Sequence, residues 1–161
     1  MSIRIGIISD THVPDRQREI PGAVLRGLAG VDMIIHAGDL TSISVLHELE
    51  KIAPVHAVSG NMDRWEVKSA LNPVMTLSIL GKAIVIMHGV SQHSATEEAA
   101  RTRYPEADCV VFGHTHRSYC EYEGKSLIFN PGSACKMFGS APSYGILIVR
   151  EGQRVEGEVI A

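Results

Sequence analysis

The stretch VVFGHTHR, residues 110–117, decides how the rest of the chain is interpreted. Its apolar first half predicts a short buried strand, and Gly113 marks the end of that strand. His114 and His116 follow one residue apart, on loop backbone that can turn both imidazoles toward one point. Imidazole is the commonest protein ligand for transition metals. Two exposed loop histidines would give the same pattern, so a metal site is indicated only if other strands supply further ligands.

Four other apolar runs also end in side chains of the kind that bind metals. These runs lie at residues 3–8, 33–35, 55–58 and 83–87. The first is continuously apolar, as in strands covered on both faces, and ligands collect at the carboxyl ends of the strands in α/β sheets. We therefore expect the side chains at the five strand ends to form one metal site. They are Asp10, His12, Asp39, Asn61, His88, His114 and His116.

Short helices are expected between these strands. The patterns predict helices over residues 21–30, 43–49 and 94–103, the last opened by a capping-box pattern. Residues 74–87 read as an antiparallel hairpin that turns at a Gly-Lys pair. Residues 65–72 show no clear period and are interpreted as an irregular connection. A βαβ arrangement is therefore expected for the first part of the chain.

The pattern changes after the two histidines. Four short strands are predicted there, at residues 118–123, 127–129, 145–149 and 154–160. No helix of useful length interrupts them, which indicates an antiparallel meander that follows the βαβ half. The sequence has no repeat, low-complexity run or linker, so we expect residues 1–161 to form a single domain.

The composition is ordinary for a globular protein of the cytoplasm. Hydrophobic residues make up 45% and charged residues 20% of 161 residues, with a formal net charge of −3. That charge argues against a nucleic-acid surface. Three cysteines without metal-type spacing predict reduced thiols in a cytoplasmic protein. No apolar run approaches the roughly 20 residues of a membrane helix, and no signal peptide is recognised.

The strand-end set contains two carboxylates, one amide and four imidazoles, which suits two divalent metal ions with a shared carboxylate. Ions about 3.5–4 Å apart drive in-line attack on phosphorus, because they lower the pKa of a bridging water and neutralise charge on the phosphoryl oxygens. The expected nucleophile is thus a bridging hydroxide. Mixed oxygen and nitrogen ligands favour manganese, zinc, iron or nickel over calcium or magnesium, and we expect manganese.

Five short motifs carry a family resemblance. In chain order they are DTH at 10–12, GD at 38–39, GN at 60–61, HG at 88–89 and GHTH at 113–116. Together they resemble calcineurin-like metallophosphoesterases, and the chain length is similar to that of the small YfcE-type phosphodiesterases, whose fold a retromer subunit shares. The resemblance spans residues 3–133. It implies an α/β fold, a two-sheet β-sandwich flanked by helices, with a dimetal phosphodiesterase site at one edge.

The resemblance also divides the candidate ligands between two ions. It implies one ion at Asp10, His12 and His116. It implies the second at Asn61, His88 and His114, with Asp39 bridging the two. The residues expected to carry catalysis are Asp39, Asn61 and His114.

One position departs from the wider superfamily. Many members carry a histidine directly after the asparagine, and it acts on the leaving group, whereas this chain has Met62. A thioether neither donates nor relays a proton. General acid catalysis contributes about 10²–10⁴-fold, so substrates with good leaving groups are favoured. The YfcE-type branch also lacks this histidine.

Several other polar residues have two interpretations. His36 either positions the second carboxylate or is a packed core histidine, which we favour. His93 is expected to be exposed, with an approach to a phosphate or to the leaving group as the alternative. Asp63 either orients a ligand or pairs with Arg64, and we favour a structural role. The arginines that are either surface charges or contacts to an anionic substrate are Arg16, Arg18 and Arg117.

Two functions of different classes follow. The first is a metal-dependent phosphodiesterase that acts on a small phosphodiester. The second is a non-catalytic protein-binding scaffold of the retromer-subunit type, which would have no need to keep all the imidazoles. We expect the pocket walls to come from residues 13–19, 62–66 and 90–94. The sequence leaves a homo-oligomer open and indicates neither a membrane nor a nucleic-acid partner.

Overall fold

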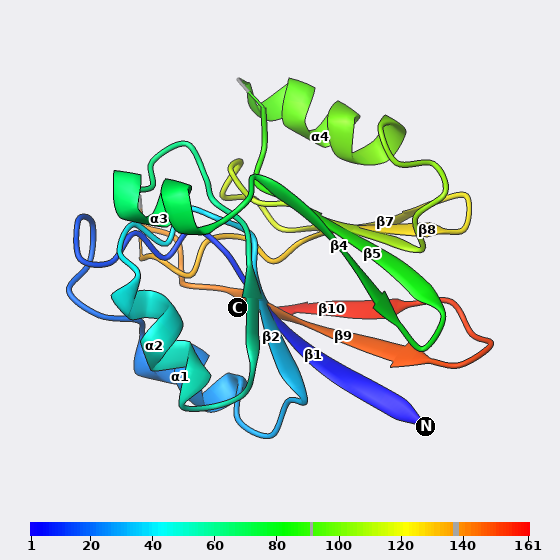
Figure 1. The fold of residues 1–161 in the computed structure, drawn as a ribbon, viewed down its shortest axis with the longest axis horizontal. Coiled ribbons are helices and arrows are strands. Elements are labelled where there is room, and N and C mark those ends of the chain that lie inside the picture. The colour runs from blue at the N-terminus through cyan, green and yellow to red at the C-terminus, as the bar shows by residue number, and fades with distance from the viewer. Residues whose placement is uncertain (91, 137–138) are drawn as a thin grey trace.

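Two five-stranded sheets lie face to face, with helices on their outer sides (Figure 1). The computed structural model describes residues 1–90, 92–136 and 139–161. The strands are β1 (Ser2–Ile8), β2 (Met33–His36), β3 (Val55–Ala57), β4 (Val74–Ile79), β5 (Lys82–Met87), β6 (Cys109–Val111), β7 (Tyr119–Glu123), β8 (Ser126–Asn130), β9 (Tyr144–Arg150) and β10 (Glu156–Ile160). The helices are α1 (Gly22–Gly27), α2 (Ser44–Glu50), α3 (Trp65–Ala70) and α4 (His93–Thr102). The predicted two-sheet α/β sandwich is confirmed.

The first sheet has the strand order β10-β9-β1-β2-β3. Its strands β1, β2 and β3 run parallel, with Ile7 opposite Ile35 and Ile35 opposite His56. Parallel neighbours need a crossover connection, which α1 and α2 supply here. β9 pairs antiparallel with β1, and β10 pairs antiparallel with β9. The loops that follow β1, β2 and β3 therefore leave the sheet at one edge.

The second sheet has the order β4-β5-β6-β8-β7. Its three central strands β5, β6 and β8 run parallel. β4 and β5 form the predicted antiparallel hairpin, with Ser78 opposite Ala83. β7 pairs antiparallel with β8. The loops after β5 and β6 thus also share one edge.

The continuous apolar runs have a simple packing explanation. Along β2, Ile35 packs between the two sheets, whereas its neighbour Ile34 packs among residues of α1 and α2. Along β6, Val111 faces the other sheet and Val110 faces α4. Successive strand residues point to opposite faces, so a strand covered on both sides is apolar at every position.

Two predictions about secondary structure were wrong. Residues 65–70 form α3 rather than an irregular connection. Val67 is the buried residue of this short helix, so its sequence shows no repeating apolar pattern. The predicted single meander is divided between the sheets. β8 lies between β6 and β7 and runs parallel to β6, whereas β9 and β10 extend the first sheet. Strand pattern does not specify which edge a strand joins.

The third predicted helix is present, but its start differs from the expected capping box. Gln92 is at the N-cap position of α4 and its side chain makes no capping hydrogen bond. The Thr96 hydroxyl instead accepts a hydrogen bond from the Val90 backbone nitrogen at 3.0 Å. Across the described residues, no helix combines the length and the apolar character that a membrane crossing requires.

Candidate metal centre

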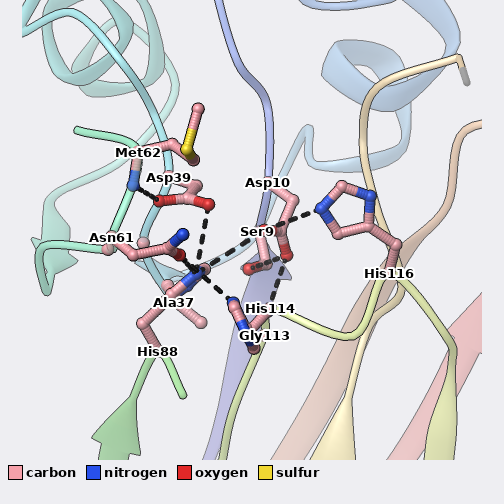
Figure 2. A network of polar contacts seen from close by, with 12 residues as sticks. Ser9, Asp10, Ala37, Asp39, Asn61, Met62, His88, Gly113, His114 and His116 are labelled. Atoms are coloured by element: carbon pink, nitrogen blue, oxygen red, sulfur yellow. Dashed lines mark hydrogen bonds and ion pairs between the residues drawn. The ribbon is translucent and has the colours of Figure 1, made fainter. Parts of the chain in front are cut away.

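The structure brings all seven predicted ligands to the edge where the strand ends of both sheets meet. Asp10 and His12 follow β1, Asp39 follows β2 and Asn61 follows β3 in the first sheet. In the second sheet, His88 follows β5, and His114 and His116 follow β6. Figure 2 shows six of these side chains pointing toward one another from the loops that follow β1, β2, β3, β5 and β6. Residues up to 106 positions apart along the chain thus form one cluster.

The backbone of this cluster has an unusual conformation. Positive φ angles occur at Asp10 (55°), His12 (48°), Asp39 (57°), His114 (70°) and His116 (59°). Non-glycine residues seldom adopt positive φ, and such residues gather at functional sites where the surrounding structure holds them in place. Elsewhere in the described chain, Thr41 and Leu80 are the non-glycine residues with positive φ. The strand ends therefore turn sharply to present their side chains inward.

The motif glycines make room for ligands that come from other strands. A Cβ atom at Gly38 would lie 2.7 Å from Nδ1 of His88, and one at Gly60 would lie 2.5 Å from the Asp39 backbone nitrogen. The same interlocking recurs in the second sheet. A Cβ at Gly89 would lie 2.6 Å from the His114 Cβ. Such distances are too short for real contacts, so each glycine is required by a ligand on a different loop.

The same requirement holds for the glycine that opens the GHTH motif. A Cβ atom at Gly113 would lie 2.9 Å from Asp10 Oδ2 and would collide with the Ser9 hydroxyl. The two β-strands that meet here come from different sheets. Gly113 therefore sets how closely the end of β6 approaches the end of β1.

The first group of ligands surrounds Oδ1 of Asp10. His116 Nε2 lies 3.2 Å and His12 Nε2 lies 3.8 Å from this oxygen. The other oxygen, Oδ2, accepts hydrogen bonds from Ser9 Oγ at 2.7 Å and from the His114 backbone nitrogen at 3.1 Å. Asp10 Oδ1 and His12 Nε2 are buried without a hydrogen-bond partner. Buried polar atoms without partners are costly, and a cation between them would satisfy both.

The second group surrounds His88. Its Nδ1–H donates to the Ala37 carbonyl oxygen at 2.8 Å, which leaves Nε2 pointing into the cluster. Nε2 lies 3.0 Å from Asn61 Oδ1 and 3.2 Å from Asp39 Oδ2 (Figure 2). His114 Nδ1 lies 3.1 Å from the same Asn61 oxygen. Ring nitrogens and oxygens from four residues converge here, so a cation placed among them would be held from several sides.

The charges of the cluster shift the pKa values of its own side chains. Burial lowers the pKa of His88, but the hydrogen bond to Asp39 and the charge of Asp10 outweigh it and raise this pKa to about 9. Burial raises the pKa of Asp10, yet the neighbouring imidazoles of His116, His12 and His88 hold it well below its ordinary value. The carboxylates are therefore ionised and the cluster attracts cations.

Asp39 lies between the two groups. Its Oδ2 is 3.8 Å from His12 Nε2 and 3.2 Å from His88 Nε2, and its Oδ1 accepts a hydrogen bond from the Met62 backbone nitrogen at 2.8 Å. Burial raises the pKa of Asp39, and the hydrogen bond from His88 more than reverses this effect. The ligand atoms of two overlapping sets lie within 4.8 Å of one another: Asp10, His12 and His116, and Asp10, Asp39 and His88.

Asp63 has a larger role than the sequence indicated. Its Oδ2 accepts hydrogen bonds from the backbone nitrogens of Asp39 at 3.1 Å and Gly60 at 2.7 Å. Its Oδ1 accepts one from the Thr41 nitrogen at 2.6 Å. Burial raises the pKa of this carboxyl above its ordinary value. The alternative ion pair with Arg64 is not formed, because Arg64 pairs with Asp15 at 2.8 Å. Asp63 therefore holds the loop that presents Asp39.

The other ambiguous histidines now have definite surroundings. His36 is fully buried, where its Nδ1 accepts from the Gly38 nitrogen and its Nε2–H donates to Thr11 Oγ1, both at 3.1 Å. Burial lowers the pKa of His36 to about 3, so it is a neutral core histidine. His93 is exposed as expected, yet its ring stands edge-on to His114 with centroids 5.6 Å apart.

A cavity of about 590 Å³ opens over the cluster. The predicted wall segments contribute Arg16, Met62 and His93, while Ser91 lies outside the described residues. The segment after β8 was missed, although it supplies a whole wall. Its lining residues are Ser133, Cys135, Ser140, Ala141 and Ser143. Cys135 is the one residue of a metal-binding type among these lining residues, and its sequence spacing did not indicate a site, so sequence patterns did not assign the segment to the pocket.

Two facing sheets with metal-type ligands at their joined strand ends define the metallophosphoesterase fold. The chain belongs to the calcineurin-like phosphoesterase superfamily, because the family model for this domain matches residues 3–152. The resemblance identified from the five motifs is thereby confirmed. Membership supports phosphoesterase activity and implies divalent metal ions as cofactors.

Individual relatives agree with this assignment. The chain is 36% identical to a probable metallophosphoesterase of Methanothermobacter thermautotrophicus, over 97% of this chain and 91% of that protein. It is 32% identical to a phosphodiesterase of Methanocaldococcus jannaschii, over 90% of this chain and 92% of that protein. Among solved structures, wild-type Vps29 of Entamoeba histolytica complexed with zinc has a TM-score of 0.76 at 25% identity, with 98% of each chain covered.

Proposed function

We propose that the protein is a phosphodiesterase that holds two divalent metal ions. Asp10, His12 and His116 would hold one ion. Asn61, His88 and His114 would hold the other, with Asp39 shared between them. The observation that carries the proposal is the geometry at His88, whose Nε2 is directed at two oxygens by the hydrogen bond between its Nδ1–H and Ala37.

The residues present fit such ions. Asp10 Oδ1 and His12 Nε2 are buried without hydrogen-bond partners, and the glycine positions leave room for the ligands. When bound, two divalent ions supply an activated water near neutral pH and neutralise charge on the phosphoryl oxygens. The mixed oxygen and nitrogen ligands favour manganese, with zinc, iron or nickel as alternatives.

The protein's own side chains then determine which substrates react. Met62 is 51% exposed and lines the cavity directly beside Asn61, at the position where a proton donor would assist the leaving group. Because its thioether donates no proton, the proposal favours small diesters whose leaving group departs without protonation. A diester fits better than a monoester because the relative from Methanocaldococcus jannaschii is itself a phosphodiesterase.

The test is metal-dependent hydrolysis of a chromogenic diester. Chelator-treated protein is supplied with manganese, zinc, iron or nickel and assayed on bis(p-nitrophenyl) phosphate, with p-nitrophenyl phosphate as the monoester comparison. His114→Ala removes a ligand, whereas His47→Ala makes the same change on the exposed face of α2. We expect the first variant to lose activity and the second to keep it. Wild-type activity no higher than that of His114→Ala would overturn the proposal.

A protein-binding scaffold is the second candidate, and the likeness to Vps29 favours it. The ligand set does not separate the two candidates, since that Vps29 structure contains zinc. Turnover does separate them, because a scaffold would bind metal without hydrolysing the diester. We also place the protein in the cytoplasm, on the ground that Cys109, Cys120 and Cys135 form no disulfide.

A further inference from the structure

The cavity over the metal centre is larger than the candidate ligands require. Its volume of about 590 Å³ falls within the range of roughly 300–1,000 Å³ found for pockets that take drug-sized ligands. Beyond the ligands, its lining includes side chains that the proposed chemistry leaves unexplained. The relevant ones are Arg16, Arg117, Ser133, Ser140 and Ser143.

The two arginines are on the two loops that present His12 and His116 of the first ligand group. Arg16 is on the loop after the DTH motif, and its backbone nitrogen donates to the His12 carbonyl oxygen at 2.8 Å. Arg117 directly follows His116, and its backbone nitrogen donates to Thr115 Oγ1 at 3.2 Å. Both backbones are thus tied to the loops that present the metal ligands. Both residues also line the cavity that opens over these ligands.

The charge of Arg117 is available to a ligand. Two other arginines pair with carboxylates, Arg64 with Asp15 at 2.8 Å and Arg150 with Glu156 at 2.9 Å. Among the described residues, no carboxylate forms an ion pair with Arg117. Asp39 is the carboxylate in the described lining of the cavity, and it faces the metal ligands. An anion beside Arg117 would therefore meet little repulsion from the protein.

The neighbouring hydroxyls are already engaged as donors. Ser133 Oγ donates to the Asp10 carbonyl oxygen at 3.0 Å, and Ser143 Oγ donates to the Pro131 carbonyl oxygen at 2.7 Å. Their hydrogens are thus used within the protein, and Ser133 Oγ also accepts a hydrogen bond from the Cys135 backbone nitrogen at 3.1 Å. Anionic oxygens need donors, so recognition of an anion on this side depends on the guanidinium groups.

We propose that the substrate carries a second anionic group, a phosphate or a carboxylate, which Arg117 binds together with Arg16 beside the Asp10 ligand group. This inference rests on the proposed phosphodiesterase function. It narrows the substrate class from any small diester to a diester whose retained ester arm ends in an anion. The planar guanidinium matches the paired oxygens of either group.

Three chromogenic diesters with one common leaving group test it. They are p-nitrophenyl ethyl phosphate, p-nitrophenyl 2-phosphoethyl phosphate and p-nitrophenyl 2-carboxyethyl phosphate. Because the leaving group is the same, the ratio of kcat/KM values reports recognition of the added anion. Charge-assisted hydrogen bonds predict a preference of about tenfold to a hundredfold over the ethyl ester, and rising salt reduces it. Preference for either anionic diester or for both supports the proposal, and preference for only one of them identifies the anion.

Variants complete the experiment. Arg117→Gln is expected to reduce the preference ratio at least several-fold. Arg18→Gln removes the same charge from a residue that lines a separate, smaller pocket, and its ratio should equal that of the wild type. Equal wild-type rates on all three diesters would overturn this inference and leave the phosphodiesterase proposal intact. A preference that survives in Arg117→Gln would also overturn it. Hydrolysis of none of the diesters would overturn both.

Discussion

Replacing Asp63 by alanine tests whether one carboxylate outside the ligand set holds the centre together. The substitution removes the acceptor from three backbone N–H groups, those of Asp39, Thr41 and Gly60. Each buried donor left without a partner costs about 1–3 kcal/mol. Asp63 is 6% exposed, so water can partly replace the lost acceptor and the lower half of that range applies. For the three donors together, the expected loss of unfolding free energy is about 3–6 kcal/mol. A typical domain has a free energy of unfolding of about 5–15 kcal/mol, so the variant is expected to fold.

The same substitution should weaken metal binding, because the Asp39 loop loses its anchor. Loss of a partner that supports a ligand typically costs about 10–100-fold in metal affinity. Urea unfolding measures the stability of the metal-free protein, and titration with manganese measures the affinity. Asp15→Ala is the matched control. It removes a carboxylate from the exposed pair with Arg64, so stability should fall by less than about 1 kcal/mol and metal affinity should not change.

If Asp63→Ala retains both its stability and its metal affinity, Asp63 does not anchor the loop that presents Asp39. The same holds if Arg64→Ala matches the loss seen in Asp63→Ala, since that result would restore the ion-pair interpretation that the structure contradicts.

Three further predictions follow from the site. Asp39→Ala should abolish binding of both ions and Asn61→Ala should weaken mainly one, and metal analysis that finds two ions retained in Asp39→Ala would contradict the bridging role. Gly60→Ala places a methyl group against the Asp39 backbone and should cost about 1–3 kcal/mol in urea unfolding; Gly22→Ala, which meets only the flexible end of an arginine, should not. The pKa of His36 is about 3 in the folded protein and 6.5 as a free side chain, so the unfolded state alone takes up a proton in this window. Stability should therefore fall with falling pH by about 1.4 kcal/mol per pH unit below 6.5, and unfolding at pH 7, 6 and 5 should show a shallower slope in His36→Asn.

The ligand positions could be predicted because the relevant information is local. Each ligand stands directly after an apolar run, and parallel strands bring their carboxyl ends to one edge. The glycines of the motifs were visible for the same reason. The steric role of these glycines could not be predicted, since Gly38 makes room for His88, which lies fifty residues away in the sequence and follows a strand of the other sheet. That relation exists only once the two sheets face each other.

Other features depend on contacts that no short pattern records. The place of β8 between β6 and β7 is a choice of sheet edge, and an apolar five-residue strand suits several edges equally. Asp63 was undervalued because two of its three hydrogen-bond donors lie more than twenty residues away, on the loop after β2. The segment with Ser140 enters the cavity without any residue type that indicates a site.

The pairing of glycines with ligands on other loops has an evolutionary consequence. In a lineage that loses the imidazole of His88, the ring no longer excludes a methyl group at Gly38, yet the φ of 97° at Gly38 still disfavours alanine there. The space for the ring is therefore kept, and a single substitution back to histidine restores the ligand. Loss of this ligand is thus easy to reverse, and a glycine kept at this position in a descendant does not by itself show that the chemistry was kept.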